Sequence, residues 1–348
     1  MSRNAPQETE MRKLQVTGGS TYVLSLPKEW VTQNKLKKGS SLLIREEENG
    51  VLSILPPEMG KPERREEAFI EVSPKDNPNA LTRKAVAAYL VGYSIIHIRA
   101  KGQQQLSSRQ RNTLKTFARR LLVGTEIVTD TSTELTLQVL LSYPELSVPS
   151  ALRRMCIITS SMHKDAITAL KEFDSRLAED VIATDSEVDR FHLYIIRQLK
   201  MAVQNPRIIK EIGLTNPRDC LGYRLITKTV ERTADHAANI ARNVLPLKKR
   251  LDEKALEKIE RMSELAISSF ETAIESLFTR EFDIAENIIE KTKKITSLEE
   301  EAVLFLREIG IQEITNVRLI IESVTRAVEY ASDIAEIVLN LTVESIVD

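Results

Sequence analysis

The stretch YRLITKTVERTADHAANIA, residues 223–241, decides the fold of the C-terminal half of this chain. Ala234, Ala238 and Ala241 recur at helical spacing, so the stretch predicts a helix with one closely packed face. A related stretch, VRLIIESVTRAVEYASDIA at residues 317–335, follows at an offset of 94. A repeat of this kind in a helical region indicates two related helical units.

An upstream pair of segments extends the repeat. LAEDVIATDSEVDRF, residues 177–191, lines up with IAENIIEKTKKITSL, residues 284–298, at an offset of 107. The two offsets differ because the segment NPRIIKEIGLTNPRDCLG lengthens one connection of the first copy. We therefore expect two tandem all-α bundles of about three helices each, over residues 150–248 and 251–345.

The composition is that of a globular, helix-rich protein with two or three domains. The chain has 348 residues, of which 42% are hydrophobic and 28% are charged. Its net charge of −1 is unevenly spread. Residues 11–45 hold seven Lys or Arg and one Glu, whereas residues 251–348 hold 22 acids and 10 bases. A basic head and an acidic tail predict different partners at the two ends.

Cysteine usage and hydropathy predict a soluble protein of the cytoplasm. Cys156 and Cys220 have no metal-like spacing, which favours free thiols in a reducing compartment. The N-terminus MSRNAPQETEMRK has no apolar run typical of a signal peptide. No stretch approaches the ~20 apolar residues of a membrane span, so we expect no membrane insertion.

Residues 66–145 alternate between strand and helix patterns, which predicts a small central α/β domain. The expected strands are residues 69–72, 95–99, 126–129 and 135–141, and the expected helices are residues 80–90 and 108–122. The runs KPERREE and SYPELSVPS read as linkers on either side. Five basic residues make the second helix basic and could face DNA, the acidic C-terminal bundle or solvent: Arg109, Arg111, Lys115, Arg119 and Arg120.

Residues 1–58 read as short strands with a short helix that begins near Pro27. Gly18–Gly19 and Asn49–Gly50 are turn signals, and residues 41–45 and 51–55 alternate like strands. A module of this size buries too little surface to be stable alone. Strands from two chains that form one barrel would remove this difficulty.

Two acid pairs stand on the helices of the first bundle. Glu231 and Asp235 are four residues apart and share one helical face, and Asp185 and Asp189 do the same on a preceding helix. If these helices are antiparallel neighbours, four carboxylates converge and attract polyvalent cations, since unbridged carboxylates repel one another. The alternative is that they are ordinary acids on solvated faces. Two nearby histidines are interpreted as surface or packing residues rather than ligands: His192 and His236.

The segment VERTADHAANIA, residues 230–241, resembles the signature helix of the PhoU family of phosphate-uptake regulators, in which a Glu, an Arg and an Asp precede Asn-Ile-Ala. The repeat over residues 150–345 is also similar to the two three-helix bundles of that family. Its members bind multinuclear iron or zinc clusters through E/D-x-x-x-D pairs. By this resemblance the ligands here are Asp185, Asp189, Glu231 and Asp235.

The second bundle departs from this pattern. Thr325 aligns with Glu231, while Glu329 and Asp333 form an E-x-x-x-D string that is one helical turn out of register. The other acid pair is replaced by two threonines, Thr292 and Thr296. A neutral hydroxyl is a poor substitute for a carboxylate toward a hard cation. We therefore predict a metal cluster in the first bundle only, with a second site that is degenerate.

The segment RKLQVTGGSTYVLSLPKEWVTQNKLKKGSSLLI, residues 12–44, resembles the swapped-hairpin DNA-binding domain of AbrB- and MazE-type regulators. The matching features are the Gly-Ser turn, the LSLPKEW segment and a Leu-x-x-Gly before the next strand. In that family two chains interleave into one barrel and bind DNA through basic loops. The candidate phosphate contacts, with the first three favoured, are Arg12, Lys13, Lys28, Lys35, Lys37 and Lys38. The alternative is a charged domain that only dimerises.

The chain shows no catalytic motif, such as a Walker-type loop or G-x-S-x-G. The two resemblances together predict a homodimeric transcriptional regulator of phosphate uptake rather than an enzyme. A second hypothesis is an adaptor that docks on a phosphate transporter ATPase or a sensor kinase, with the N-terminal module serving dimerisation alone. A carboxylate-bridged metalloenzyme is a third, but the Glu-x-x-His string expected of such a bundle site does not occur.

Overall fold

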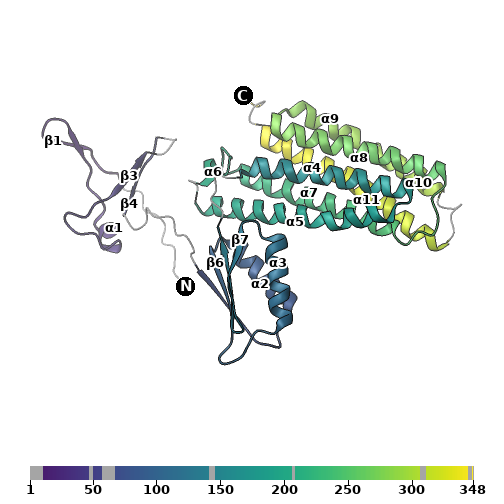
Figure 1. The fold of residues 1–348 in the computed structure, drawn as a ribbon. Helices are drawn as coiled ribbons and strands as arrows, with labels where there is room; N and C mark the ends of the chain where they lie inside the picture. Colours follow the sequence, from purple (N-terminus) through teal and green to yellow (C-terminus); the bar gives the residue numbers. More distant parts are fainter. Residues whose placement is uncertain are drawn as a thin grey trace. The chain divides into compact units, whose positions relative to one another are not determined.

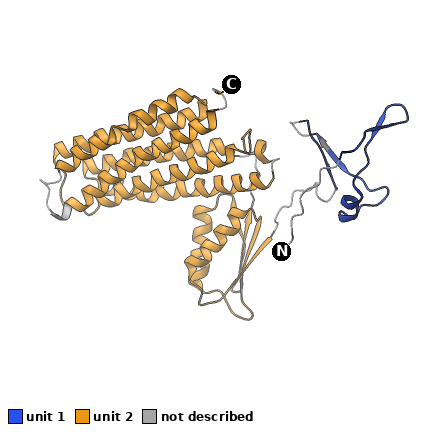
Figure 2. Cartoon of the chain, turned by 180° about the vertical axis from the view of Figure 1, so that it is seen from behind, with its two compact units in different colours: residues 1–63 blue, residues 64–348 orange. Residues whose placement is uncertain are grey.

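The computed structural model describes residues 11–46, 50–56, 67–140, 146–205, 208–305, 311–343 and 347 (Figure 1). The chain divides into two compact units, residues 1–63 and residues 64–348 (Figure 2). The expected turn residue Asn49, residues 61–66 of the first expected linker and residues 142–145 of the second lie outside the described residues, and residues 148–150 of the second linker are helical instead.

The first unit consists of two β-hairpins and a short helix. Its elements are β1 (Gln15–Thr17), β2 (Thr21–Val23), α1 (Lys28–Gln33), β3 (Leu43–Glu46) and β4 (Leu52–Leu55). β1 pairs with β2 and β3 with β4, both antiparallel. Gly18 and Gly19 have φ of 65° and 87°, values that glycine adopts without strain in a tight hairpin turn. The hairpins are separate two-stranded sheets, so no closed barrel forms among the described residues of one chain.

The apolar side chains of these hairpins have no core of their own. Leu14, Tyr22, Ile44 and Leu52 are 63%, 69%, 66% and 64% exposed. Exposed apolar patches on a small module are typical of surfaces that a partner covers. The barrel built from two chains stays a prediction, and these side chains are what it would bury.

The second unit begins with a mixed sheet covered on one face by two helices (Figure 1). Its elements are β5 (Glu67–Val72), α2 (Pro78–Val91), β6 (Ile95–Ala100), α3 (Ser108–Leu121), β7 (Thr125–Asp130) and β8 (Glu134–Val139). The strand order is β5-β6-β8-β7, with β5 and β6 parallel and the other pairs antiparallel. The predicted strands and helices lie within two residues of these bounds, which confirms the α/β domain.

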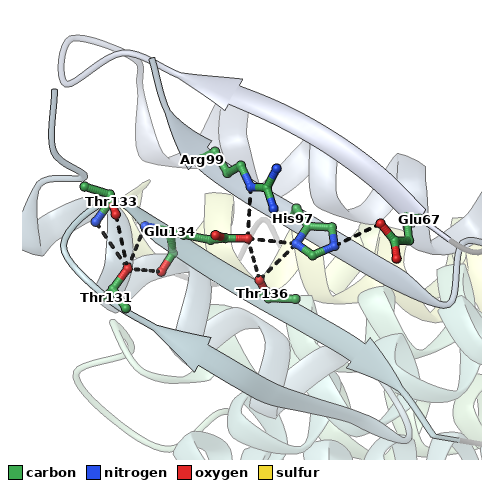
Figure 3. Close-up of polar contacts among 7 residues, drawn as sticks. All are labelled: Glu67, His97, Arg99, Thr131, Thr133, Glu134 and Thr136. Atoms are coloured by element: carbon green, nitrogen blue, oxygen red, sulfur yellow. Dashed lines mark hydrogen bonds and ion pairs between the residues drawn. The ribbon is translucent and has the colours of Figure 1, made fainter. Parts of the chain in front are cut away.

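The opposite face of this sheet carries a polar network across three strands (Figure 3). His97 on β6 lies 2.8 Å from Glu134 on β8 and 3.5 Å from Glu67 on β5. The hydrogen bond from His97, with further bonds from Arg99 and Thr136, holds the pKa of Glu134 below its usual range. The network ties neighbouring strands together on a face without covering helices.

Two residues of the basic helix α3 are neutralised within their own domain. Arg111 and Lys115 both pair with Asp130 of β7, the latter at 2.9 Å. Arg120 instead donates to the Ala183 carbonyl of a later helix at 3.4 Å. Arg111 and Lys115 therefore pair within the sheet domain, which differs from the expected orientations toward DNA, the acidic C-terminal bundle or solvent.

The rest of the unit is helical. The first bundle contains α4 (Val148–Glu172), α5 (Ser175–Gln204), the short α6 (Ile208–Glu211) and α7 (Asp219–Val244). The second contains α8 (Glu253–Thr279), α9 (Phe282–Thr292), α10 (Ile295–Phe305) and α11 (Ile311–Thr342). The expected repeat is confirmed, and it extends to α4 and α8: Phe173 and Arg280, 107 residues apart, cap these helices with the same φ of 57°. α9 and α10 together occupy the place of the unbroken α5.

The two bundles share one hydrophobic core. α7 packs along α11, and at Gly222 an added Cβ would lie 2.7 Å from the side chain of Leu341, so any side chain there requires Leu341 to move. α4 packs on α8, where Lys164 pairs at 2.7 Å with Glu271, the residue at its own position in the second copy. The free cysteines Cys156 and Cys220 are buried, as predicted.

A buried arginine joins the sheet domain to the first bundle. Arg197 of α5, 6% exposed, donates to the Tyr89 carbonyl and, at 3.1 Å, to the Gly92 carbonyl at the end of α2. Its guanidinium also lies over the Tyr89 ring, 4.7 Å from the centroid. None of the described helices has the length and apolar character needed to cross a membrane.

Candidate functional site

The four predicted carboxylates lie on two helices that pack together. α5 supplies Asp185 and Asp189, and α7 supplies Glu231 and Asp235. All four side chains are partly buried, which follows from their position at the edge of the α5–α7 contact. The i,i+4 spacing on two packed helices therefore places the acids along one contact, and their role as metal ligands stays a prediction.

Electrostatics show that these acids act on one another. Burial, followed by the charges of Asp185, Glu231 and Asp235, raises the pKa of Asp189 to about 6. Burial and Asp235 likewise raise the pKa of Asp185, and burial and Glu231 raise that of Asp235. Partly desolvated carboxylates that disfavour one another's charge form a site that a cation stabilises.

Two cations missed in the sequence already neutralise part of this charge. Lys228 donates to Glu231 from one turn earlier on α7. Arg242, also on α7, lies 3.4 Å from Asp185 of α5. The i,i+3 spacing of Lys228 and Glu231 was a readable signal, because such pairs meet on a helix surface. The contact of Arg242 joins residues 57 positions apart and has no local signature.

The donor set fits a hard or borderline polyvalent cation. Four carboxylates supply the oxygen ligands. Burial and the charge of Lys228 lower the pKa of His192 on α5 to about 4, so its imidazole is neutral, and its Nδ1 is buried without a hydrogen-bond partner. As placed, no three Asp, Glu, His or Cys side chains among the described residues are close enough to share one ion.

The second bundle lacks this arrangement. α9 ends at Thr292 and α10 begins at Ile295, so the helix breaks between the two threonines that replace Asp185 and Asp189. Thr292 donates to a backbone carbonyl at 2.9 Å, and Thr296 is exposed. Glu329 pairs with Arg326 at 2.7 Å, and burial followed by Glu336 raises the pKa of Asp333. The degenerate second site stays a prediction, with the broken helix as an added reason.

The six candidate phosphate-contacting residues of the N-terminal unit are all exposed. Arg12 and Lys13 precede β1, and Lys28 is the first residue of α1. The remaining three share the loop after that helix: Lys35, Lys37 and Lys38. No described acid pairs with any of the five lysines. They are therefore available to an anion, and their part in DNA binding stays a prediction.

Comparison with known proteins gives these features a family. The model of the PhoU domain matches residues 152–244 and again residues 259–338. The chain contains two PhoU domains. The model of the MazE bacterial antitoxin, described as antidote-toxin recognition, matches residues 15–66. The acid quartet lies in the first PhoU domain, and the basic residues are on or next to the MazE-type domain.

Solved structures share the fold of the two PhoU domains. The phosphate transport system regulatory protein PhoU from Streptococcus pneumoniae is 21% identical, with a TM-score of 0.50, over 58% of this chain and 96% of that one. PhoU from Pseudomonas aeruginosa is 20% identical, with a TM-score of 0.50, over 57% and 96%. The comparison with curated proteins found no match. Both structural matches leave about two fifths of this chain uncovered.

Proposed function

We propose that this PhoU-domain protein is a homodimeric transcriptional regulator of phosphate uptake in the cytoplasm, and not an enzyme. The observation that carries the proposal is the joining of a basic MazE-type domain to two PhoU domains in one chain. Neither part implies this role alone. A DNA-binding MazE-type domain would allow phosphate-responsive PhoU domains in the same chain to act at promoters.

The N-terminal unit supports both dimerisation and DNA binding. Its exposed apolar strands gain a core when a second chain completes the barrel, and the dimer doubles the number of exposed lysines. Phosphate contacts make DNA affinity fall steeply with salt, by a slope of about −0.9 per contact.

A gel-shift titration over a salt series tests the proposal. The probes are DNA upstream of this protein's gene and of phosphate-transport genes, with random DNA as the reference. Replacement of Arg12, Lys13 and Lys28 by Ala should weaken binding to all sequences and lower the salt slope by about 1 for each lost contact. Binding no tighter than to random DNA would exclude the regulator.

We further propose that the acid quartet of the first PhoU domain holds an iron or zinc cluster. Asp185, Asp189, Glu231 and Asp235 would be the ligands, and the metal would supply the charge that balances them. Metal analysis of purified protein should find metal that is lost when Asp185 and Glu231 become Asn and Gln. Retention of the metal would refute these ligands.

The second candidate function is a signalling adaptor that docks on a transporter ATPase or sensor kinase. It is favoured by the structural likeness to a protein whose name is phosphate transport system regulatory protein. Under this hypothesis the N-terminal MazE-type domain serves dimerisation alone. The triple Ala variant separates the two functions, because it would leave an adaptor's partner docking and phosphate response intact.

A further inference from the structure

The first PhoU domain has an open groove between α4 and α5, away from the acid quartet. The groove has a volume of about 300 Å³. Its floor is apolar and includes Met162 and Val181, which belong to the core. Ile157, at its edge, is 70% exposed. An apolar floor that continues to an exposed isoleucine is unusual for a helix surface facing only water.

The rim of the groove is acidic. Asp165 on α4 and Asp180 and Glu187 on α5 line it, and no Lys or Arg does. Asp165 accepts a hydrogen bond from Ser161 at 3.2 Å, but no described cation pairs with any of the three. Acids on α8 of the second bundle, by contrast, pair with cations of α4, as at Lys164–Glu271 and Lys171–Glu260. The rim therefore offers negative charge to something outside the chain.

The second PhoU domain supplies an internal comparison, because its α8–α9 surface is the same position 107 residues later. There Glu264 replaces Ile157, and Lys291 replaces Thr184. Lys291 donates to Ser268 at 2.9 Å and so bridges α9 to α8 across the former groove. The three acids of the rim become Thr272, Asn287 and Lys294. The second domain thus has a Lys291–Ser268 bridge at the position of the groove and none of its three rim acids.

We propose that the α4–α5 groove of the first PhoU domain docks a basic amphipathic helix of a partner protein. Asp180 and Glu187 are seven residues apart, about 10 Å along α5, which matches cations two turns apart on a helix. Apolar anchors at i and i+4 of that helix fill the floor, in the manner of helix-in-groove recognition. The volume is at the lower end for small-molecule pockets, roughly 300–1,000 Å³, and suits side-chain anchors. This docking is independent of DNA and metal binding.

The test uses full-length protein and two labelled Ala-based helical peptides of about 16 residues, long enough to hold helical structure. One carries Leu anchors flanked by Lys, and the other has Glu in place of Lys. Fluorescence anisotropy should show binding of the Lys peptide only, weakened by added salt. The double variant Ile157→Glu/Thr184→Lys, which copies the second domain, should weaken it at least about tenfold.

The matched control is Glu264→Gln/Lys291→Gln at the same positions of the second domain, which should bind like the wild type. If the first double variant does not fold, Asp180→Asn/Glu187→Gln at exposed positions replaces it and should lose both affinity and salt dependence. The proposal is overturned if the Lys peptide fails to bind or binds the variants equally. It is also overturned if the variants change the mass of the assembly in sedimentation instead, because the occupant is then a second copy of this chain.

Discussion

Replacement of Asp189 by Asn should stabilise the metal-free protein at neutral pH. The folded pKa of Asp189 is about 6, against an ordinary value of 3.8. Between these values the folded chain keeps a proton that the unfolded chain has released, so stability falls as pH rises through this window. Above pH 6 the full penalty is present. Asn has nearly the same shape and does not titrate, so the variant escapes the penalty.

The magnitude follows from the size of the shift. At about 1.4 kcal/mol per pKa unit, the shift corresponds to a ceiling of about 3 kcal/mol. Asp189 is only partly buried, so solvent screening reduces this, and we expect a gain of about 1 kcal/mol at pH 7.5. At pH 4.5 the folded wild type is already protonated at this position, and the difference should nearly vanish.

Added metal should make the wild type more stable than the Asp189→Asn variant. A ligand that binds only the folded state at 100 times its Kd adds about 2.7 kcal/mol to the wild type. The Asn variant has lost a carboxylate ligand and should gain much less. The difference in free energy of unfolding between the Asn variant and the wild type should therefore change sign when metal replaces chelator. Such a change would distinguish a metal site from a cluster of solvated acids.

Urea denaturation followed by circular dichroism measures each difference, at pH 4.5 and 7.5 with chelator and at pH 7.5 with Fe²⁺ or Zn²⁺. The control is Glu179→Gln, which removes one negative charge at an exposed position of α5. It should show none of these effects. The reasoning is refuted if the Asn variant is less stable in chelator at pH 7.5. A gain that is equal at both pH values would contradict it as well, and equal metal stabilisation of both proteins would remove Asp189 from the ligand set.

Four further predictions concern other parts of the molecule. Burial lowers the pKa of His163, which lies 3.0 Å from Ser263, to about 4, so stability should fall as pH drops below 6.5. His163→Phe, the residue at the equivalent position of α8, should remove about 2.5 kcal/mol of the loss measured by urea denaturation between pH 7.5 and 4.5. Arg197→Met leaves the carbonyls of Tyr89 and Gly92 without their charged donor and should lower the free energy of unfolding by about 3 kcal/mol, whereas Lys200→Met on the exposed face should not. Gly222→Ala should destabilise by about 1–3 kcal/mol through its clash with Leu341, and Leu341→Ala in the same chain should reduce the clash, as thermal unfolding of the single and double variants would show. Ile44→Glu places a charge on an exposed apolar strand and should yield monomers in sedimentation velocity, while persistence of a dimer would locate the interface elsewhere.

Local patterns predicted the parts of the fold that depend on local physics. The strands and helices of the α/β domain were predicted within two residues, because alternation and helical periodicity change sharply at its turns. The acid pairs were found for the same reason, since i,i+4 spacing fixes a shared face. That the two helices pack together was only a condition of the hypothesis, and the mutual effect of the acids on pKa agrees with it.

Contacts between segments far apart in the chain could not be predicted from the sequence. Nothing near Arg242 indicates Asp185, and nothing near Arg197 indicates the end of α2. The break between α9 and α10 has no Pro or Gly to mark it. The side chain of Thr292 bonds to a carbonyl of the preceding turn, and Lys291, Lys293 and Lys294 crowd like charges there, two effects that weaken a helix.

The unequal repeats have a common energetic reason. An unbridged acid quartet and an open apolar groove both lower the stability of the domain that carries them, and both lie in the first PhoU domain. The second domain has threonines and a Lys291–Ser268 bond in their place and shares its core with the first along α7 and α11. It can therefore stabilise a neighbour whose surface is less favourable for packing. If the two proposed sites bind their ligands, one copy of the duplicated bundle serves binding and the other serves support, because the shared core lets stability in one copy offset its loss in the other.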